Sequence, residues 1–531
     1  MKRIFNIKTW VMALFVLMTS SCDGFLEQTD TSSINENSLF LKPADGYSLV
    51  TGVYNTLNSS IDYTLKGIWF TANFPSQDFH NAGSDTFWNT YEIPTDFDAL
   101  NVFWSNNYIG ISRANAAIPI LEGMIERGVL TEQEGKQLIG ECYFLRGLFY
   151  YYLGVDFGGV PLELETVSDE GLHPRNTQDE VFEAVANDMK TAFELLPWKA
   201  DQPLADRGRA TKEAALAYQG DALMWLKKYG EALPLFSQID GKCQLEENYV
   251  NIHEIAYRNG KESIFEIQFT EYGSMSWGQF GVNNQWISSF CMPKAVSDFA
   301  YAYGDKNLYD SYQSGDTRKL ATIIGPGDEH PSPIIDFKDY PRLIEYAQNG
   351  GAGEPAEYYQ DGNGEPLNTC GTVDRPWVAD GSGYFCVKYW RNPEVCGTRG
   401  KGWFLSPDNV MQMRYAQVLL SKAECLHRTG DSNGAMAIIN QIRDRGFGKL
   451  LDASITVPSP VETDVMKIIL DEYRHELAGE CSLWFVLRRS GEHIQFIKDK
   501  HGISIPTGKD LMPIPQTQIG LNQNLVQNPG Y

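Results

Sequence analysis

The chain has 531 residues, 43% of them hydrophobic, and carries a formal net charge of −24 at pH 7. A surface this acidic argues against nucleic acid and anionic lipid headgroups as partners, because both would be repelled. A neutral ligand and a basic protein surface are both compatible with the charge, which does not choose between them.

The N-terminus has the pattern of an export signal. Lys2, Arg3 and Lys8 precede an apolar run from Trp10 to Met18, which is too short to cross a bilayer. We therefore expect residues 1–21 to be a signal peptide that is removed. Because this segment holds three basic and no acidic residues, the remaining 510 residues carry a net charge of −27.

A lipid anchor is predicted at Cys22, the residue after this signal. Thr19, Ser20 and Ser21 precede it as in a lipoprotein processing site, although Thr19 stands where leucine is usual. Acylation of Cys22 would hold the protein on a membrane, with residues 22–42 as the tether. The alternative is ordinary cleavage that leaves Cys22 as a free thiol. No later stretch approaches the ~18 consecutive apolar residues of a membrane-spanning helix.

Eight cysteines follow Cys22 in a chain that is expected to reach an oxidising compartment. Cys370, Cys386 and Cys396 share a loop-rich stretch, and one disulfide among them is an open alternative. Neither a CxxC pair nor a Cys/His cluster with zinc spacing occurs, so the sequence predicts no metal site of this kind.

Helical patterns dominate the N-terminal part, residues 43–244. The first pattern covers residues 43–58, and capping boxes predict further helix starts at Thr131 and Thr177. Pro197 is expected to end the helix that begins after Thr177.

Two segments read as pairs of helices. Residues 210–239 predict two helices meeting at Tyr229–Gly230, with a face of small residues that lets paired helices approach closely, as in tetratricopeptide repeats. Residues 409–446 predict a second pair that turns at Thr429–Gly430–Asp431. This pair opens the C-terminal part, residues 406–531.

Between residues 245 and 405 the helical period fades, and glycine, proline, asparagine and aromatic residues dominate. Short alternating runs such as SIFEIQF, residues 263–269, predict brief strands. The predicted fold is therefore mainly α, with tetratricopeptide-like helix pairs and a long, irregular, loop-rich insertion that contains short β segments. Ligand contacts are expected in the insertion, because loops held by a rigid scaffold carry specificity.

The tail, residues 511–531, does not read as an amphipathic helix, because Pro513 and Pro515 remove amide donors and fix φ. We expect an extended segment on a preformed surface, with asparagine and glutamine amides bonding its backbone.

Several segments together resemble one protein family. They are the PIP…QNPGY tail, WSNNYIGISRANAAI (104–118), GECYFLRGLFYYYLGVDFGGVPL (140–162), RYAQVLLSKAECLHRTGD (414–431), INQIRDRG (439–446) and a charged motif with Glu472, Arg474, Glu476, Leu477, Glu480, Leu487, Arg489 and Gly491. On these residues the chain resembles the SusD-like (RagB/SusD) nutrient-capture lipoproteins of Bacteroidota. The charged motif departs from the family pattern at Tyr473, Cys481, Leu483 and Val486. We expect its charges to join helices into a network rather than to perform chemistry.

The resemblance implies a predominantly α-helical lipoprotein on the outer membrane that faces the cell surface, and Asp23 and Glu27 resemble the acidic context of such display. It implies a SusC-like TonB-dependent outer-membrane transporter as partner, and a glycan, or sometimes another nutrient, as ligand. It implies neither catalysis nor a cofactor.

Candidate ligand contacts follow from sugar chemistry, since aromatic faces suit pyranose C–H groups and polar side chains suit the hydroxyls. Residues 68–94 combine both kinds in a stretch that no helix period explains. The predicted contacts in this stretch are Trp88, Asp78, His80, Asn89, Phe87 and Tyr91. A second region, residues 271–290, adds Trp277, Trp286, Asn283 and Asn284. On this interpretation, alanine at Trp88 or Trp286 weakens binding without unfolding the protein, whereas core packing is the alternative role for each tryptophan.

Two other functions compete with ligand capture. A surface hydrolase would need paired carboxylates, which counting cannot exclude, but no HExxH, GxSxG or P-loop pattern occurs. A pure assembly protein would use the helix pairs and hold no ligand. Calcium in the Asp/Asn/Gly-rich loops stays open, although no EF-hand spacing occurs.

Overall fold

The computed structural model describes residues 40–58, 62–82, 85–169, 171–270, 286–297, 300–351, 353–377, 382–390 and 407–531. Within these ranges no helix is long and apolar enough to cross a membrane. The predicted lipidation site, Cys22, and Cys396 lie outside them.

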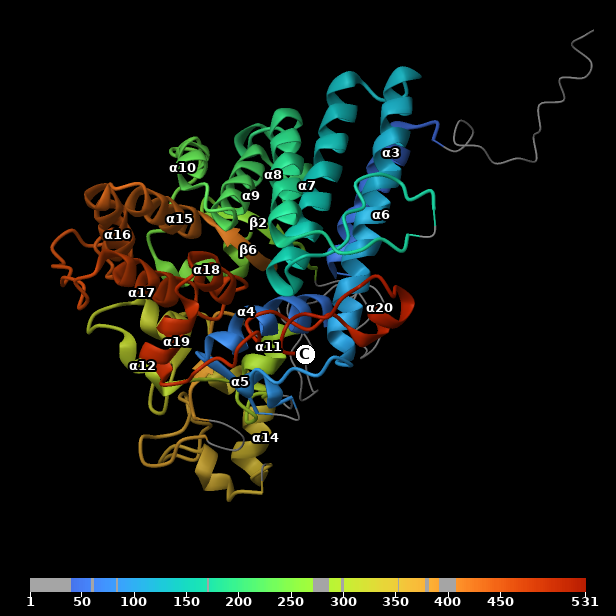
Figure 1. The fold of residues 1–531 in the computed structure, drawn as a ribbon. Helices are drawn as coiled ribbons and strands as arrows, with labels where there is room; N and C mark the ends of the chain where they lie inside the picture. Colours follow the sequence, from blue (N-terminus) through green and yellow to red (C-terminus); the bar gives the residue numbers. More distant parts are fainter. Residues whose placement is uncertain are drawn as a thin grey trace, which may run out of the picture.

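An array of helices forms the upper half of the molecule in Figure 1. Its members are α3 (Pro43–Tyr54), α6 (Asp98–Glu126), α7 (Glu132–Phe157), α8 (Gln178–Leu195), α9 (Lys212–Trp225), α10 (Tyr229–Ser237), α15 (Tyr415–Arg428) and α16 (Ser432–Gly446). From α6 onward each helix packs on the next, and α10 packs on α15. Helices from both ends of the chain therefore share one scaffold, as the predicted fold class requires.

Local sequence signals position these helices as predicted. The Thr131 hydroxyl accepts the Glu134 N–H at 3.2 Å and the Glu134 carboxylate accepts the Thr131 N–H at 3.1 Å, which forms the first capping box. The box at Thr177 is also present, and its helix ends at Leu195, just before Pro197. In the pair α9–α10, a Cβ at Gly220 would lie 2.6 Å from the Phe236 ring, so only glycine allows this approach.

Two predicted boundaries are wrong. The predicted helix starting at residue 409 begins only at Tyr415, because Val410–Arg414 forms β6 and pairs antiparallel with β2 (Ser263–Ile267). A partner strand distant in sequence thus overrides the local helical pattern. The turn between α9 and α10 also lies before Tyr229 rather than at Tyr229–Gly230.

The insertion contains only short elements in its described residues, and its predicted strand at residue 263 is confirmed as β2. Its other strands and α-helices are α11 (Ile287–Cys291), β3 (Ala302–Gly304), α12 (Lys306–Ser311), α13 (Arg318–Thr322), β4 (Ile323–Ile324), α14 (Pro341–Asn349) and β5 (Phe385–Cys386). β4 pairs with β5, and β3 pairs with β1 (Phe79–Asn81), which precedes the insertion. A second hydrophobic cluster, separate from the main core, includes Trp377 and Trp390 and stabilises this part.

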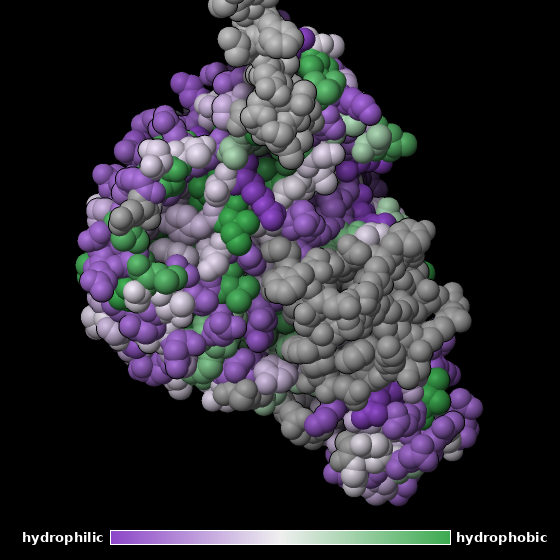
Figure 2. Space-filling model, turned by 90° about the vertical axis from the view of Figure 1, so that its right-hand side faces the viewer, coloured by the Kyte–Doolittle hydropathy of each residue, from purple (hydrophilic) through white to green (hydrophobic). Residues whose placement is uncertain are grey.

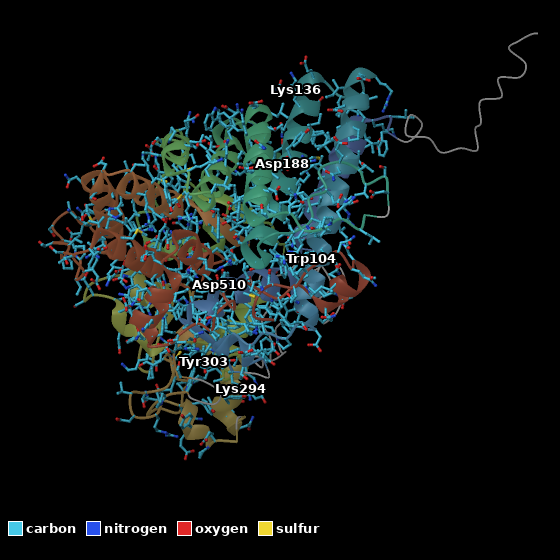
Figure 3. All side chains as sticks on the ribbon, in the orientation of Figure 1. Trp104, Lys136, Asp188, Lys294, Tyr303 and Asp510 are labelled. Carbon is cyan, nitrogen blue, oxygen red and sulfur yellow. The ribbon has the colours of Figure 1, made fainter. Side chains whose placement is uncertain are left out.

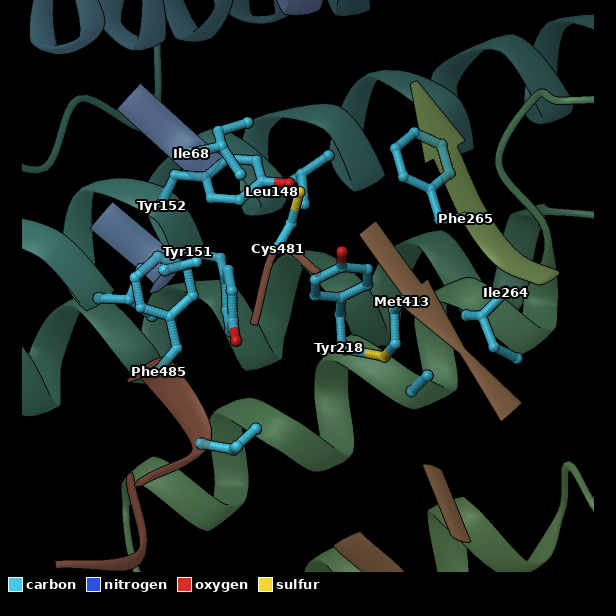
Figure 4. Packing of buried hydrophobic residues seen from close by; sticks show 14 of the residues in the cluster. Ile68, Leu148, Tyr151, Tyr152, Tyr218, Ile264, Phe265, Met413, Cys481 and Phe485 are labelled. Atoms are coloured by element: carbon cyan, nitrogen blue, oxygen red, sulfur yellow. The ribbon is translucent and has the colours of Figure 1, made fainter. Parts of the chain in front are cut away.

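The main core is rich in aromatic side chains (Figure 4). Tyr151 and Tyr152 of α7, Tyr218 of α9 and Phe265 of β2 are all at most 4% exposed. The Tyr151 hydroxyl donates to the buried Asp221 carboxylate at 3.0 Å, so burial of this phenol leaves its polar group paired. The core therefore joins the helix array to the β2–β6 pair.

A buried charge network lies where α17 (Val465–Leu477) meets the β2–β6 pair, and the network role predicted for the charged motif is confirmed. The Glu476 carboxylate contacts the guanidinium groups of Arg414 at 2.5 Å, Arg318 at 3.1 Å and Arg445. All four side chains are 0% exposed. Burial raises the pKa of Glu476, but the three arginines outweigh it and hold the pKa well below its usual range. The network thus joins α17 to three other segments that are far apart in the chain.

The C-terminal elements complete the lower half of the molecule. They are α18 (Leu483–Ser490), α19 (His493–His501) and α20 (Gln516–Leu521), and the shortest N-terminal helices beside them are α4 (Thr71–Asn73) and α5 (Phe87–Thr90). Figure 1 shows the chain end in the lower half of the molecule, where the Tyr531 hydroxyl donates to the Leu511 carbonyl at 3.1 Å.

The tail lies on this surface through its amides, as predicted. Asn528 Nδ2 donates to the carbonyls of Phe157 at 3.0 Å and Met512 at 2.7 Å, and its Oδ1 accepts from Arg175 at 2.7 Å. The prediction of a wholly extended tail is wrong, because α20 begins directly after Pro515. Proline suits a helix start, where its missing N–H costs nothing.

Candidate functional site

Asp78, a predicted ligand contact, is a structural ion-pair partner in this fold. Its carboxylate is 0% exposed and receives Arg474 Nε at 2.9 Å and Nη2 at 2.6 Å, while His501 Nε2 lies 3.3 Å away. Burial raises the pKa of Asp78, but Arg474 outweighs it and lowers the pKa. These bonds tie the segment before β1 to α17 and leave Asp78 no surface for a sugar.

Trp88 lies in the core. Its side chain is 0% exposed, and its ring centroid lies 6.3 Å from Phe70, 6.1 Å from Phe74 and 6.0 Å from Phe97. No face of the indole is therefore available for stacking in this arrangement. Trp104, labelled in Figure 3, is another packed tryptophan: it lies on α6 of the helix array and is 4% exposed.

The neighbours of Trp88 divide between core and surface. Tyr91 is 2% exposed, and its hydroxyl donates to the Pro75 carbonyl at 2.7 Å. Phe87 and Asn89 on α5 are half-buried and lie nearer the surface. Only Phe87 and Asn89 of this group thus keep an exposed part for a ligand.

The second predicted region is described in part. Trp286, at the start of α11, is 1% exposed. Trp277, Asn283 and Asn284 lie outside the described residues, so their predicted roles stay predictions.

His80 lies on the surface beside residues that the sequence did not single out. On β1 it stands opposite Tyr303 of β3, with ring centroids 5.6 Å apart. A second ring pair lies beside β3: the ring centroids of Tyr309 and Tyr384 are 4.9 Å apart. The Gly304 N–H of β3 donates to the Tyr384 carbonyl at 2.7 Å, which holds Tyr384 next to the strand. These are two separate ring pairs on and beside β3, and we call their residues, His80, Tyr303, Tyr309 and Tyr384, the β3 surface. All four rings are half-buried, and Figure 3 shows Tyr303 in the lower half of the molecule.

Charged groups fix the β3 surface. Asp305 Oδ2 lies 2.9 Å from His80 Nε2, and its Oδ1 accepts the Asn307 N–H at 2.7 Å, which caps α12. Burial raises the pKa of Asp305, but the bonds from His80 and Asn307 outweigh burial and lower the pKa overall, so the carboxylate stays charged. Lys319 Nζ lies 3.5 Å from the centre of the Tyr309 ring. The surface thus combines ring faces with charged hydrogen-bonding groups.

No local signal marked Tyr303, Tyr309 or Tyr384. They belong to short strands and loops within a long stretch of mixed aromatic and polar residues, and only the β1–β3 pairing brings Tyr303 to His80. Pairing between residues about 220 positions apart is not readable from one sequence.

A Ser–His pair lines a different cavity, of about 360 Å³, next to α17. Ser311 Oγ lies 3.0 Å from His475 Nε2 but already donates its only hydrogen to the Leu308 carbonyl at 2.7 Å. Ser311 Oγ must therefore accept from His475 Nε2–H, which is the wrong arrangement for a base that activates serine. Burial and the nearby Arg318 lower the pKa of His475 to about 3, so the imidazole is also a weak base.

The depressed pKa of His475 predicts acid sensitivity. The unfolded chain takes up this proton near its ordinary pKa of 6.5, whereas the folded protein does so only near 3, so stability falls as the pH drops below about 6.5. Between pH 7 and pH 5 the wild type should lose about 2 kcal/mol more unfolding free energy than His475→Gln. Urea denaturation of both proteins at the two pH values measures the difference. Equal losses would mean that His475 titrates normally in the folded protein.

A larger cavity of about 590 Å³ lies between α6 and α20. Figure 2 views the side that carries α20 and shows hydrophobic side chains among largely hydrophilic ones. Exposed aliphatic residues line this cavity: Ile109, Val167, Leu172 and Leu521. Gln518 in its wall donates to Asn101 and Ser105, and Asn522 donates to the His173 carbonyl, so their donors are committed. Ser112, Arg113 and Glu163 also line the cavity, so its wall is mainly apolar with some polar groups.

The structure contains no disulfide among its described cysteines, so it gives no support to a pairing of Cys370 with Cys386. Pairing of either with Cys396 lies outside the described residues. Among those residues, no group of three or more His, Cys, Asp and Glu side chains could hold a metal ion.

Sequence comparison places the chain among known proteins. The profile described as "SusD family" matches residues 244–531, and the profile described as "Starch-binding associating with outer membrane" matches residues 24–220. SusD-like protein P2 of Formosa agariphila is 24% identical over 98% of this chain and 99% of its own length. A SusD-like protein of Bacteroides ovatus is 23% identical over 91% of this chain and 82% of its own length.

Solved structures have the same fold. A SusD homolog from Bacteroides thetaiotaomicron superposes with a TM-score of 0.71 at 20% identity, covering 93% of this chain and 98% of that one. Surface glycan-binding protein A from Bacteroides thetaiotaomicron, solved in complex with laminarihexaose, gives a TM-score of 0.68 at 19% identity, covering 91% and 99%. The predicted mainly helical, tetratricopeptide-like fold is confirmed.

Proposed function

Because this chain belongs to the SusD family, whose members are non-catalytic glycan-binding proteins, we propose that it captures an oligo- or polysaccharide at the cell surface. It then delivers the glycan to a SusC-like TonB-dependent outer-membrane transporter. The protein itself is tethered to the outer membrane through a lipid on Cys22.

The observation that carries glycan capture is the β3 surface. It presents half-buried rings with charged and polar groups near them, which suit the C–H faces and the hydroxyls of a pyranose. The structural relative that was solved with laminarihexaose supports a β-glucan as one ligand class to test. The matched description "associating with outer membrane" supports the location.

The proposed contacts differ from those predicted, because burial removes some of the predicted side chains from the surface. His80, Phe87 and Asn89 stay in the proposal because each keeps an exposed part. Trp277, Asn283 and Asn284 also stay in it on the sequence argument alone. Trp88, Tyr91, Asp78 and Trp286 are buried and are no longer proposed as ligand contacts.

Tyr303→Ala tests the β3 surface. Loss of one stacking face should weaken glycan binding roughly tenfold, about 1.4 kcal/mol. The unfolding free energy should fall by less than it does when a fully buried ring is removed, because Tyr303 is only half-buried against the second hydrophobic cluster. Isothermal titration calorimetry on the wild type and variant measures the affinity.

Tyr143→Ala is the matched control, because Tyr143 is also half-buried but lies on α7, away from β3. It should bind glycan as the wild type does. Wild-type affinity in Tyr303→Ala, with binding intact elsewhere, would remove the β3 surface from the site.

A further inference from the structure

Two buried thiols face each other behind the β3 surface. Cys291 ends α11 and is 0% exposed, and Cys386 ends β5 and is 1% exposed. Their side chains are within hydrogen-bonding reach of each other. No sequence signal paired them, because they stand in different segments of the insertion.

The backbone explains why these two cysteines meet. The Tyr301 N–H, just before β3, donates to the carbonyl of Phe290 at 2.9 Å, which places Cys291 beside the start of β3. The Gly304 N–H donates to the Tyr384 carbonyl at 2.7 Å, which places β5 along the same strand. The elements that carry both thiols, α11 and β5, therefore both pack on β3, the strand that carries Tyr303.

The electrostatics make the pair unequal. Burial raises the pKa of the Cys386 thiol, but hydrogen bonds from Cys291 and the Lys388 N–H, together with the Lys388 charge, outweigh it and lower the pKa. Burial raises the pKa of Cys291 well above its usual range. A thiol with a lowered pKa beside a second thiol is the usual arrangement of an attacking cysteine and its resolving partner.

We propose that Cys291 and Cys386 form a disulfide in the exported protein and thereby cross-link α11 to β5 around the strand that carries Tyr303. The inference rests on the proposed function only in requiring export to an oxidising compartment.

The chemistry balances with an oxidised thiol oxidoreductase of that compartment. Before folding buries it, the Cys386 thiolate attacks one sulfur of the enzyme's disulfide and releases the other as a thiolate. The Cys291 thiolate, formed by loss of its proton, then attacks the Cys386 sulfur in the mixed disulfide. The Cys291–Cys386 bond forms, the enzyme leaves as a dithiol, and the pair has lost two protons and two electrons.

The experiment uses the full chain recovered from the outer-membrane fraction. Alkylation with iodoacetamide in denaturant without reductant, followed by digestion and mass spectrometry, should yield a linked peptide pair holding Cys291 and Cys386. That species should be two hydrogens lighter than the two reduced peptides and should separate on reduction. Alkylation of both cysteines, or linkage of Cys386 to Cys370, Cys396 or Cys481, would overturn the proposal.

Variants give an independent reading. In Cys291→Ala, Cys386 should become fully alkylated, whereas Cys142→Ala, a buried cysteine of α7, should leave the linked peptide unchanged. Reductant should lower the Tm of the wild type and of Cys142→Ala but not that of the Cys291→Ala/Cys386→Ala protein. If Cys291→Ala does not fold, the wild-type peptide map alone still decides.

Failure of this inference is separable from failure of the proposed function. Free thiols in protein that is recovered from the outer membrane and binds glycan would overturn the cross-link alone. A cross-linked protein that binds no glycan would support the disulfide and remove glycan capture.

Discussion

Replacement of Glu476 by glutamine should lower the unfolding free energy by about 3–5 kcal/mol, the cost of removing one partner from a buried ion pair. The charge of Glu476 faces Arg414, Arg445 and Arg318, which are 0% exposed. A neutral amide would leave these guanidinium groups with too little compensating charge. Each arginine has further carboxylate partners, such as Glu480 for Arg414, which limits the loss.

Urea denaturation of Glu476→Gln against the wild type measures this effect. Glu132→Gln is the matched control, because the 74%-exposed Glu132 carboxylate pairs with Lys136 at the surface. Surface pairs of this kind contribute about 0–1 kcal/mol, so the control should be nearly neutral. Equal effects of the two substitutions would mean that the buried network does not hold α17 to the β2–β6 pair.

Trp88→Ala should also destabilise the protein by about 3–5 kcal/mol, because it empties the space of a large, fully buried ring. This expectation replaces the sequence-based one, in which the substitution weakened binding without unfolding. The surrounding rings of Phe70, Phe74 and Phe97 cannot close the gap completely, since packed aromatic groups relax only in part.

Thermal and urea unfolding of Trp88→Ala and Trp88→Phe provide the test. Phenylalanine keeps most of the apolar volume, so Trp88→Phe should lower the unfolding free energy by only about 1–2 kcal/mol. The folded fraction of both variants should bind glycan with the wild-type affinity. A stable Trp88→Ala protein with weakened binding would return Trp88 to the ligand site.

Many helix boundaries and turns of this fold depend only on residues that are close together in the chain, so the sequence predicts them. The capping boxes at Thr131 and Thr177, the small-residue face around Gly220 and the turn at Thr429–Asp431 each depend on neighbours a few residues apart. The β6 strand was missed because its residues become a strand only through β2, far away in the chain.

The candidate site is less predictable because exposure is a property of the folded chain. Composition identified residues 68–94 as rich in aromatic and polar groups, but it could not tell the buried Trp88 from the surface-facing His80. Similarly, the sequence predicts that Asp78 binds sugar hydroxyls, whereas in the folded chain its carboxylate pairs with Arg474 of α17. Polar and aromatic residues serve cores and sites alike, and only tertiary packing separates the two uses.

Calorimetric titration of lipid-free residues 23–531 with a panel of polysaccharides, laminarin among them, tests the central claim most directly. Heat reports binding wherever it occurs, whereas tryptophan fluorescence would depend partly on indoles such as Trp88 and Trp286 that are buried here. We expect saturable binding of one glycan class, with affinity reduced in Tyr303→Ala and unchanged in Tyr143→Ala. The absence of binding across the panel would contradict glycan capture by this protein.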